Sequence, residues 1–189
     1  ELTERLRSMA QVISYEISMG LSLVGVMRMA GSLNLSKIVE AQGDSFLSMY
    51  LFPQAIGFFV FFISMLAETN RVPFDLPEAE TELVSGYSTE YSGMRYAIFF
   101  MAEYIGMIVM AAIGTVCFLG GWDGPFAVPW FPALWFVGKI YLFMFLFIWI
   151  RATLPRYRYD QLMDLGWKLL IPLALANIVV TACFKALLG

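Results

Sequence analysis

The sequence contains no histidine and only two cysteines, and these shortages remove several chemistries at once. Histidine-ligated haem, catalytic triads with a histidine base and most zinc sites all need an imidazole. Cys117 and Cys183 lie far apart, each within an apolar run, so we expect packed thiols rather than metal ligands. The sequence therefore predicts no metal site in this chain.

Charged residues are also scarce. Only 14% of the residues are charged and 60% are hydrophobic, whereas a soluble domain has about 25% charged residues. This balance is typical of a chain whose solvent is mainly lipid. We therefore expect an integral membrane protein with no nucleic acid partner.

Five apolar stretches are long enough, at about 1.5 Å per residue, to cross roughly 30 Å of hydrocarbon. They predict an all-α, polytopic transmembrane helix bundle that forms a single membrane domain over residues 1–189. The expected helices cover about 9–30, 50–67, 96–119, 133–150 and 167–188, and an acidic cytoplasmic loop covers 68–95.

Lysine and arginine favour one side of this arrangement by eight to three. The positive-inside rule then places the N-terminus and the loops 68–95 and 151–166 in the cytoplasm. The loops 31–49 and 120–132 and the C-terminus face outward. The chain begins without an initiator methionine or a signal peptide, so we expect it to be part of a longer protein.

Three ionisable residues fall inside the expected helices, where they are costly unless they face protein or water. Glu16 and Glu103 each lie roughly 10 Å below the cytoplasmic surface, and Lys139 lies near mid-membrane. One interpretation is that Lys139 pairs with a carboxylate of a neighbouring helix and only stabilises the bundle. The other is that all three line a polar path for protons or a polar ligand.

The cytoplasmic loop 68–95 combines six acids with only two arginines. Asp75 and Glu78 resemble a capping box with Pro77 in the first turn, which predicts a short helix ending at Gly86. Prolines and aromatic residues make the loop stiffer than a tether needs. It is either a solvated acidic surface or a functional segment, and the mixed-charge loop 151–168 on the same side contacts lipid headgroups or docks a soluble partner.

These segments resemble a known family. AETNRVPFDLPEAETELVSGYSTEYSGMRYAIFFMAEY is similar to the central signature of the H subunit of respiratory complex I, called NADH dehydrogenase subunit 1 in mitochondria. AQVISYEISMGLSLVGV, NLSKIVEAQ and WIRATLPRYRYDQLMDLGWK resemble other parts of the same family. Because the family has eight helices, this chain corresponds to the last five.

The resemblance implies a subunit of proton-translocating NADH:quinone oxidoreductase, an enzyme only as part of that complex. Such a subunit forms part of the chamber where ubiquinone or menaquinone is reduced, and it couples that reduction to proton translocation through buried carboxylates. No redox cofactor is expected in this chain. FMN and iron–sulfur clusters belong to partner subunits, and quinone is the substrate.

The resemblance also implies roles for individual residues and a set of partners. The expected proton relay comprises Glu16, Glu68, Glu80, Glu82, Glu90, Glu103 and Lys139. The expected vicinity of the quinone chamber comprises Arg71, Phe74, Asp75, Glu78, Arg151, Arg158 and Asp160. The implied partners are the hydrophilic-arm quinone-site subunits, an iron–sulfur subunit, small membrane and antiporter-like subunits, and the lipid bilayer. A bacterial cytoplasmic (inner) membrane is favoured over the mitochondrial inner membrane.

Three alternatives remain open on the sequence. The first is the homologous subunit of a membrane-bound hydrogenase, a formate hydrogenlyase or a ferredoxin-dependent photosynthetic complex. The second is an autonomous ion transporter that uses Glu16, Glu103 and Lys139, although no internal repeat is visible. The third is a structural anchor whose acidic loop serves only for docking.

Overall fold

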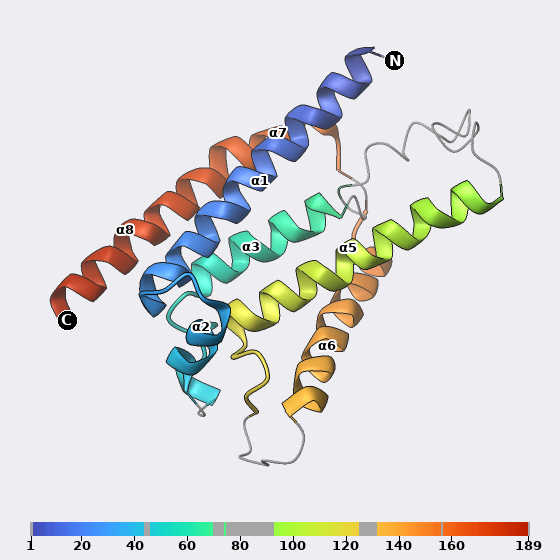
Figure 1. The fold of residues 1–189 in the computed structure, drawn as a ribbon. Coiled ribbons are helices and arrows are strands. Elements are labelled where there is room, and N and C mark those ends of the chain that lie inside the picture. The colour runs from blue at the N-terminus through green and yellow to red at the C-terminus, as the bar shows by residue number, and fades with distance from the viewer. Residues whose placement is uncertain are drawn as a thin grey trace.

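The computed structural model describes residues 2–43, 46–69, 74, 93–124, 132–155 and 157–188. These ranges contain helices and turns and no strand. The helices are α1 (Leu2–Ala30), α2 (Leu35–Gln42), η1 (Phe46–Ser48), α3 (Ala55–Glu68), α5 (Met94–Phe118), α6 (Pro132–Thr153), α7 (Tyr159–Asp164), η4 (Leu165–Leu170) and α8 (Ile171–Leu188). The prediction of an all-α polytopic membrane bundle is confirmed (Figure 1).

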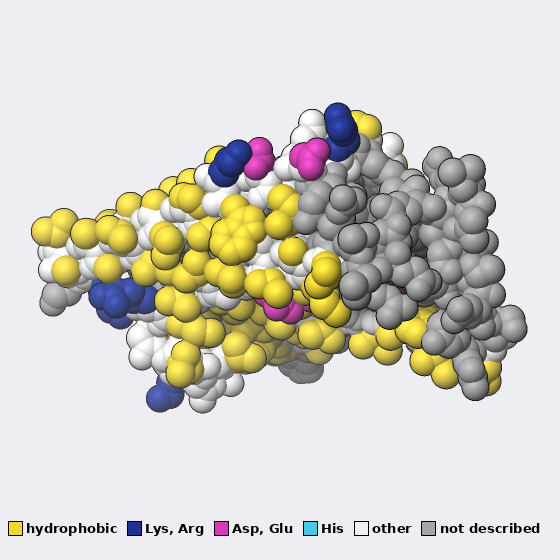
Figure 2. All heavy atoms as spheres, turned by 90° about the horizontal axis from the view of Figure 1, so that it is seen from above, with side chains coloured by type: hydrophobic (Ala, Val, Ile, Leu, Met, Phe, Trp, Pro, Cys, Tyr) yellow, Lys and Arg dark blue, Asp and Glu magenta, His cyan; other side chains and the backbone are white. Residues whose placement is uncertain are grey.

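Within the described residues, four segments are long and apolar enough to cross a membrane. They are Met9–Ala30, Tyr96–Phe118, Pro132–Thr153 and Asp160–Leu187. Hydrophobic side chains cover most of the described surface in Figure 2, and the charged side chains lie mainly toward its margins. A surface of this kind is suited to contact with acyl chains rather than water.

The helices form two groups. α1 packs against both α3 and α8, and α3 also contacts α8. α5 packs mainly against α6 and touches α3 near its own C-terminal end. Figure 1 shows the N-terminal half of α5 extending away from the α1–α3–α8 group. In that half of α5 nearly all the described side chains are exposed.

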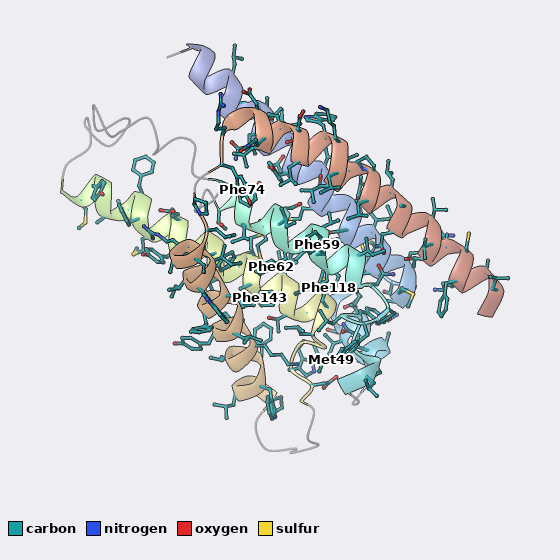
Figure 3. The ribbon with its side chains drawn as sticks, turned by 180° about the vertical axis from the view of Figure 1, so that it is seen from behind. Met49, Phe59, Phe62, Phe74, Phe118 and Phe143 are labelled. Atoms are coloured by element: carbon teal, nitrogen blue, oxygen red, sulfur yellow. The ribbon has the colours of Figure 1, made fainter. Side chains whose placement is uncertain are left out.

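An aromatic cluster joins the two groups. Phe58 and Phe62 of α3 lie 6.2 and 6.3 Å, between ring centroids, from Phe143 of α6, and Phe58 lies 5.4 Å from Phe118 of α5. Figure 3 shows Phe62, Phe118 and Phe143 in the region where α3, α5 and α6 meet. Gly114 permits this approach, because a Cβ at that position would lie only 2.9 Å from the Phe61 ring.

The second membrane segment differs from the sequence prediction. The helix was expected from about residue 50, but α3 begins at Ala55, and residues 49–54 form turns. At about 1.5 Å per residue, its 14 residues are shorter than the hydrocarbon layer. The end of α5 holds this turn in place, because Leu51 N–H donates to the carbonyl of Phe118 at 3.0 Å.

The last membrane segment begins earlier than predicted and is not uniform. α7 leads directly into η4, a π-helical stretch, which leads into α8. Pro172 follows this stretch and has no N–H to donate to the carbonyl of Lys168, which favours a local change of hydrogen-bond register. Such π-helical stretches are frequent beside functional sites.

Candidate functional site

At the end of the bundle predicted to be cytoplasmic, the first half of α1 meets the end of α3, Phe74 and the start of α7. We call this region the cytoplasmic junction. It comprises Gln11, Ser14, Tyr15, Glu16, Glu68, Thr69, Phe74, Tyr157, Leu162 and Gly166. Three of these residues, Glu16, Glu68 and Phe74, were predicted as site residues from the sequence.

Phe74 fixes one point of the acidic loop against the bundle. Its side chain is buried, and its carbonyl accepts a hydrogen bond of 3.3 Å from Gln11 Nε2. Its ring packs edge-on against Tyr15 at 5.7 Å and beside Tyr157 at 6.2 Å, measured between centroids. Figure 3 shows Phe74 at the end of α3.

Tyr15 and Ser14 attach α7 and η4 to α1. The fully buried Tyr15 donates its hydroxyl to the carbonyl of Leu162 at 2.8 Å. Gly166 packs directly on α1, since a Cβ there would lie 3.1 Å from Ser14 Oγ. A larger side chain at position 166 would therefore push η4 away from α1.

A pair of carboxylates lies beside this contact. Glu68 is the last residue of α3 and is partly buried, and its Oε2 is buried with no hydrogen-bond partner among the described residues. The Glu16 carboxylate acts on it electrostatically. Two carboxylates that interact in this way repel each other when both are charged.

Glu16 itself is exposed in this chain. It lies two residues from both Ser14 and Ser18, so it points away from the buried serine face of α1. An exposed carboxylate within a membrane span is costly unless protein or water covers it. Glu16 is thus accessible from outside this chain, whereas the Oε2 atom of Glu68 is buried.

Glu103 lies on α5, on the other helix group, and is half-buried. It is the one acid within the membrane segment Tyr96–Phe118. The structure does not bring it to the cytoplasmic junction, since α5 packs chiefly against α6 and meets α1 through few contacts.

Lys139 is also placed apart from Glu16, Glu68 and Glu103, and the carboxylate that acts on it is that of Asp123. We expected Lys139 near mid-membrane, but its ammonium reaches the outer end of α5 and donates to the carbonyls of Leu119, Gly121 and Asp123. The long side chain extends toward the interface, and cations favour the negative end of a helix. The sequence prediction placed Lys139 near mid-membrane because it counted only the backbone rise along α6 and left out the length of the side chain.

The outer end of α5 has a second polar anchor that the sequence did not single out. Gln42 is fully buried and donates to the carbonyl of Val116 at 2.9 Å. Its Oε1 accepts from Gly120 N–H at 2.9 Å and from Tyr50 N–H at 3.3 Å. Its only sequence signal was a glutamine at the end of an amphipathic segment. Together with Lys139, Gln42 satisfies the backbone groups that the end of α5 leaves unpaired.

A buried amide network, also not predicted, joins α3 to α8. Asn177 Nδ2 donates to Gln54 Oε1 at 2.7 Å, and Gln54 Nε2 donates to Thr181 Oγ1 at 2.6 Å. Gly25 on α1 and Gly57 on α3 lie against this network, and a Cβ at either would come within 2.9 Å of Asn177 Nδ2. These contacts hold α1, α3 and α8 together.

The remaining predicted residues divide into two sets. Arg151 is exposed in the last turn of α6, Asp160 is exposed in the first turn of α7, and exposed Arg158 donates its N–H to Gln161 Oε1 at 3.3 Å. These three lie on the same side as the cytoplasmic junction. The other predicted residues lie outside the described part of the chain: Arg71, Asp75, Glu78, Glu80, Glu82 and Glu90.

No cluster of three or more metal-ligating side chains occurs among the described residues. Cys117 is buried and Cys183 is exposed on the apolar surface, and both are free thiols. The arrangement can therefore hold and exchange protons at carboxylates, whereas its described residues contain no set for binding a metal.

The apolar helices and the polar groups enclosed between them define an integral, polytopic α-helical membrane protein. A family model described as NADH dehydrogenase matches residues 2–182. The chain belongs to this family and, within it, to the branch formed by the H subunits of NADH-quinone oxidoreductase, which is respiratory complex I. The family inferred from the sequence motifs is thus confirmed.

Similarity to curated relatives is high over nearly the whole chain. It is 54% identical to the second H subunit of NADH-quinone oxidoreductase from Koribacter versatilis, covering 96% of this chain and 54% of that protein. The second H subunit of Geobacter metallireducens is 56% identical, with 96% and 51% covered. The H subunit of Paramagnetospirillum magneticum is 53% identical, with 97% and 54% covered. The chain spans about half the length of these relatives.

Proposed function

We propose that this chain is part of the membrane subunit that borders the quinone chamber of a proton-translocating NADH:quinone oxidoreductase. The curated relatives are named as H subunits of NADH-quinone oxidoreductase, which favours the quinone-reducing branch over hydrogenases and ferredoxin-dependent complexes. The chain contributes to catalysis as a subunit. Quinone is the substrate, and FMN and the iron–sulfur clusters reside in partner subunits of a bacterial cytoplasmic membrane.

The observation that carries this proposal is the Glu16–Glu68 pair beside the buried anchor Phe74. Phe74 is held against the bundle, and in this proposal the acidic loop supplies Arg71 and Asp75 to the chamber. Reduction of a quinone takes up protons and changes the charge of the chamber. In this proposal a change of charge in the chamber shifts a proton between these carboxylates and their surroundings.

The same change of charge is passed through the acidic loop to the other membrane subunits of the complex. In this proposal the mutually repelling Glu80, Glu82 and Glu90 respond to the charge of the chamber, and Glu103 on α5 passes the change onward. The partners that receive it are the small membrane subunits and the antiporter-like subunits. Glu16, on the exposed side of α1, faces whatever protein covers that side in the complex.

Replacement of Glu68 in the assembled complex tests the proposal. Glu68→Gln keeps the shape and polarity of the side chain but removes its exchangeable proton. In sealed membrane vesicles we expect proton translocation per electron to fall by at least about tenfold. Glu40→Gln, at an exposed acid of α2 near the outer end, is the matched control and leaves the ratio unchanged. An unaltered ratio in Glu68→Gln contradicts the proposal.

A further inference from the structure

Among the described residues, one buried hydroxyl of the helices lacks the partner that its counterparts have. Ser14 and Ser18 on α1 donate to carbonyls of their own helix at 2.8 and 3.0 Å. Thr115 on α5 and Thr181 on α8 do the same at 2.8 and 2.7 Å. Ser64 on α3 is fully buried, yet its Oγ has no hydrogen-bond partner among the described residues. Its hydroxyl is thus turned away from the carbonyls of its own helix.

A second unsatisfied atom lies one turn further along α3. Glu68 Oε2 is buried and has no hydrogen-bond partner in the described part of the chain. Residues four apart on a helix are neighbours, with about 5–6 Å between their Cβ atoms. A hydroxyl that can donate and a carboxylate oxygen that can accept therefore lie side by side without bonding each other directly.

Helical periodicity places both groups toward the interior. Gly57 lies seven residues before Ser64 and therefore on the same face of α3. Gly57 packs against Asn177 of α8, and Glu68 interacts with Glu16 of α1. Ser64 lies between these two contacts and is fully buried, so it faces the space enclosed by α1, α3 and α8. The rings of Phe58 and Phe62, which meet α6, lie on a different side of α3.

Two unsatisfied polar groups inside a membrane bundle are unfavourable, because lipid offers no alternative partner. A buried water needs two to four polar partners, and a hydroxyl beside a carboxylate supplies them. We propose that Ser64 and Glu68 hold a water molecule between α1, α3 and α8. The water accepts a hydrogen bond from Ser64 Oγ and donates one to Glu68 Oε2.

High-resolution maps of the whole complex test the site without reference to activity. In the wild-type protein we expect an ordered water within hydrogen-bond distance of both Ser64 Oγ and the Glu68 carboxylate. The Ser64→Ala variant loses this water. Ser18→Ala, which removes an equally buried hydroxyl that is satisfied by its own helix, retains it. A wild-type map in which Ser64 Oγ bonds a backbone carbonyl and no water is present overturns the inference.

Discussion

Tyr15 donates its hydroxyl to the carbonyl of Leu162 across 147 positions of sequence, at 2.8 Å and with no exposure of the Tyr15 side chain to solvent. This bond ties the first membrane helix to the start of the last one. The ring of Tyr15 also packs on Phe74, so one side chain contacts both Phe74 and α7. The position of Phe74 therefore depends on α1 and α7 together.

Tyr15→Phe tests this dependence. The ring contact with Phe74 stays, but the Leu162 carbonyl loses its partner, at a cost of about 1–3 kcal/mol. We expect a lower dissociation temperature of the assembled complex and a slower rate of quinone reduction. Tyr141→Phe removes a hydroxyl from an exposed tyrosine of α6 and serves as the control. Equal behaviour of the two variants would show that the bond does not position the loop.

The amide network between α3 and α8 predicts a second effect. Asn177→Leu keeps a side chain of similar length but leaves Gln54 Oε1 without its donor. Hydrogen bonds between membrane helices contribute about 0.6–2 kcal/mol, so we expect less assembled protein in membranes. Val180→Leu, on the exposed side of α8, leaves the amount unchanged. In a double-mutant cycle, Gln54→Leu and Asn177→Leu should be coupled, and additive effects would contradict the network.

Mutation of Lys139 distinguishes between two possible roles of this residue. The sequence assigned it to the proton relay, and this assignment remains a prediction. Its three carbonyl contacts at the end of α5 predict instead that Lys139→Met weakens assembly, while the complexes that do assemble keep their ratio of protons to electrons. Lys139→Arg restores assembly in part, since it keeps the charge at the helix end. Normal assembly with lost translocation in Lys139→Met would favour the relay role.

Much of the fold follows from apolar run length, because lipid leaves helices as the way for these segments to satisfy their backbones. The motif around the acidic loop was enough to identify the family. The start of α3 could not be read in this way, because residues 50–54 are nearly as apolar as a helix but are held in turns by contacts with the end of α5. Hydropathy is insensitive to such a tertiary contact.

The candidate site was only partly predictable. Glu16 stood out because carboxylates are rare in apolar segments, whereas Glu68 was named through the family resemblance. Gln42, Gln54 and Asn177 did not stand out, because an uncharged amide in a membrane helix has no signal until its partners on other helices are known. The sequence also gave no signal for Ser64. A buried serine usually donates a hydrogen bond to a carbonyl of its own helix, and only the structure reveals that Ser64 does not.

The most direct test of carboxylate coupling is a redox-triggered infrared difference spectrum of the assembled complex. Reduction of the quinone should change the protonation of the Glu16–Glu68 pair, which produces a difference band in the carboxylic C=O stretching region. We predict that this band disappears in Glu68→Gln, shifts in Glu16→Gln and persists in Glu40→Gln. Spectra that are the same in all four proteins, wild type included, would contradict the proposal that these carboxylates respond to quinone chemistry.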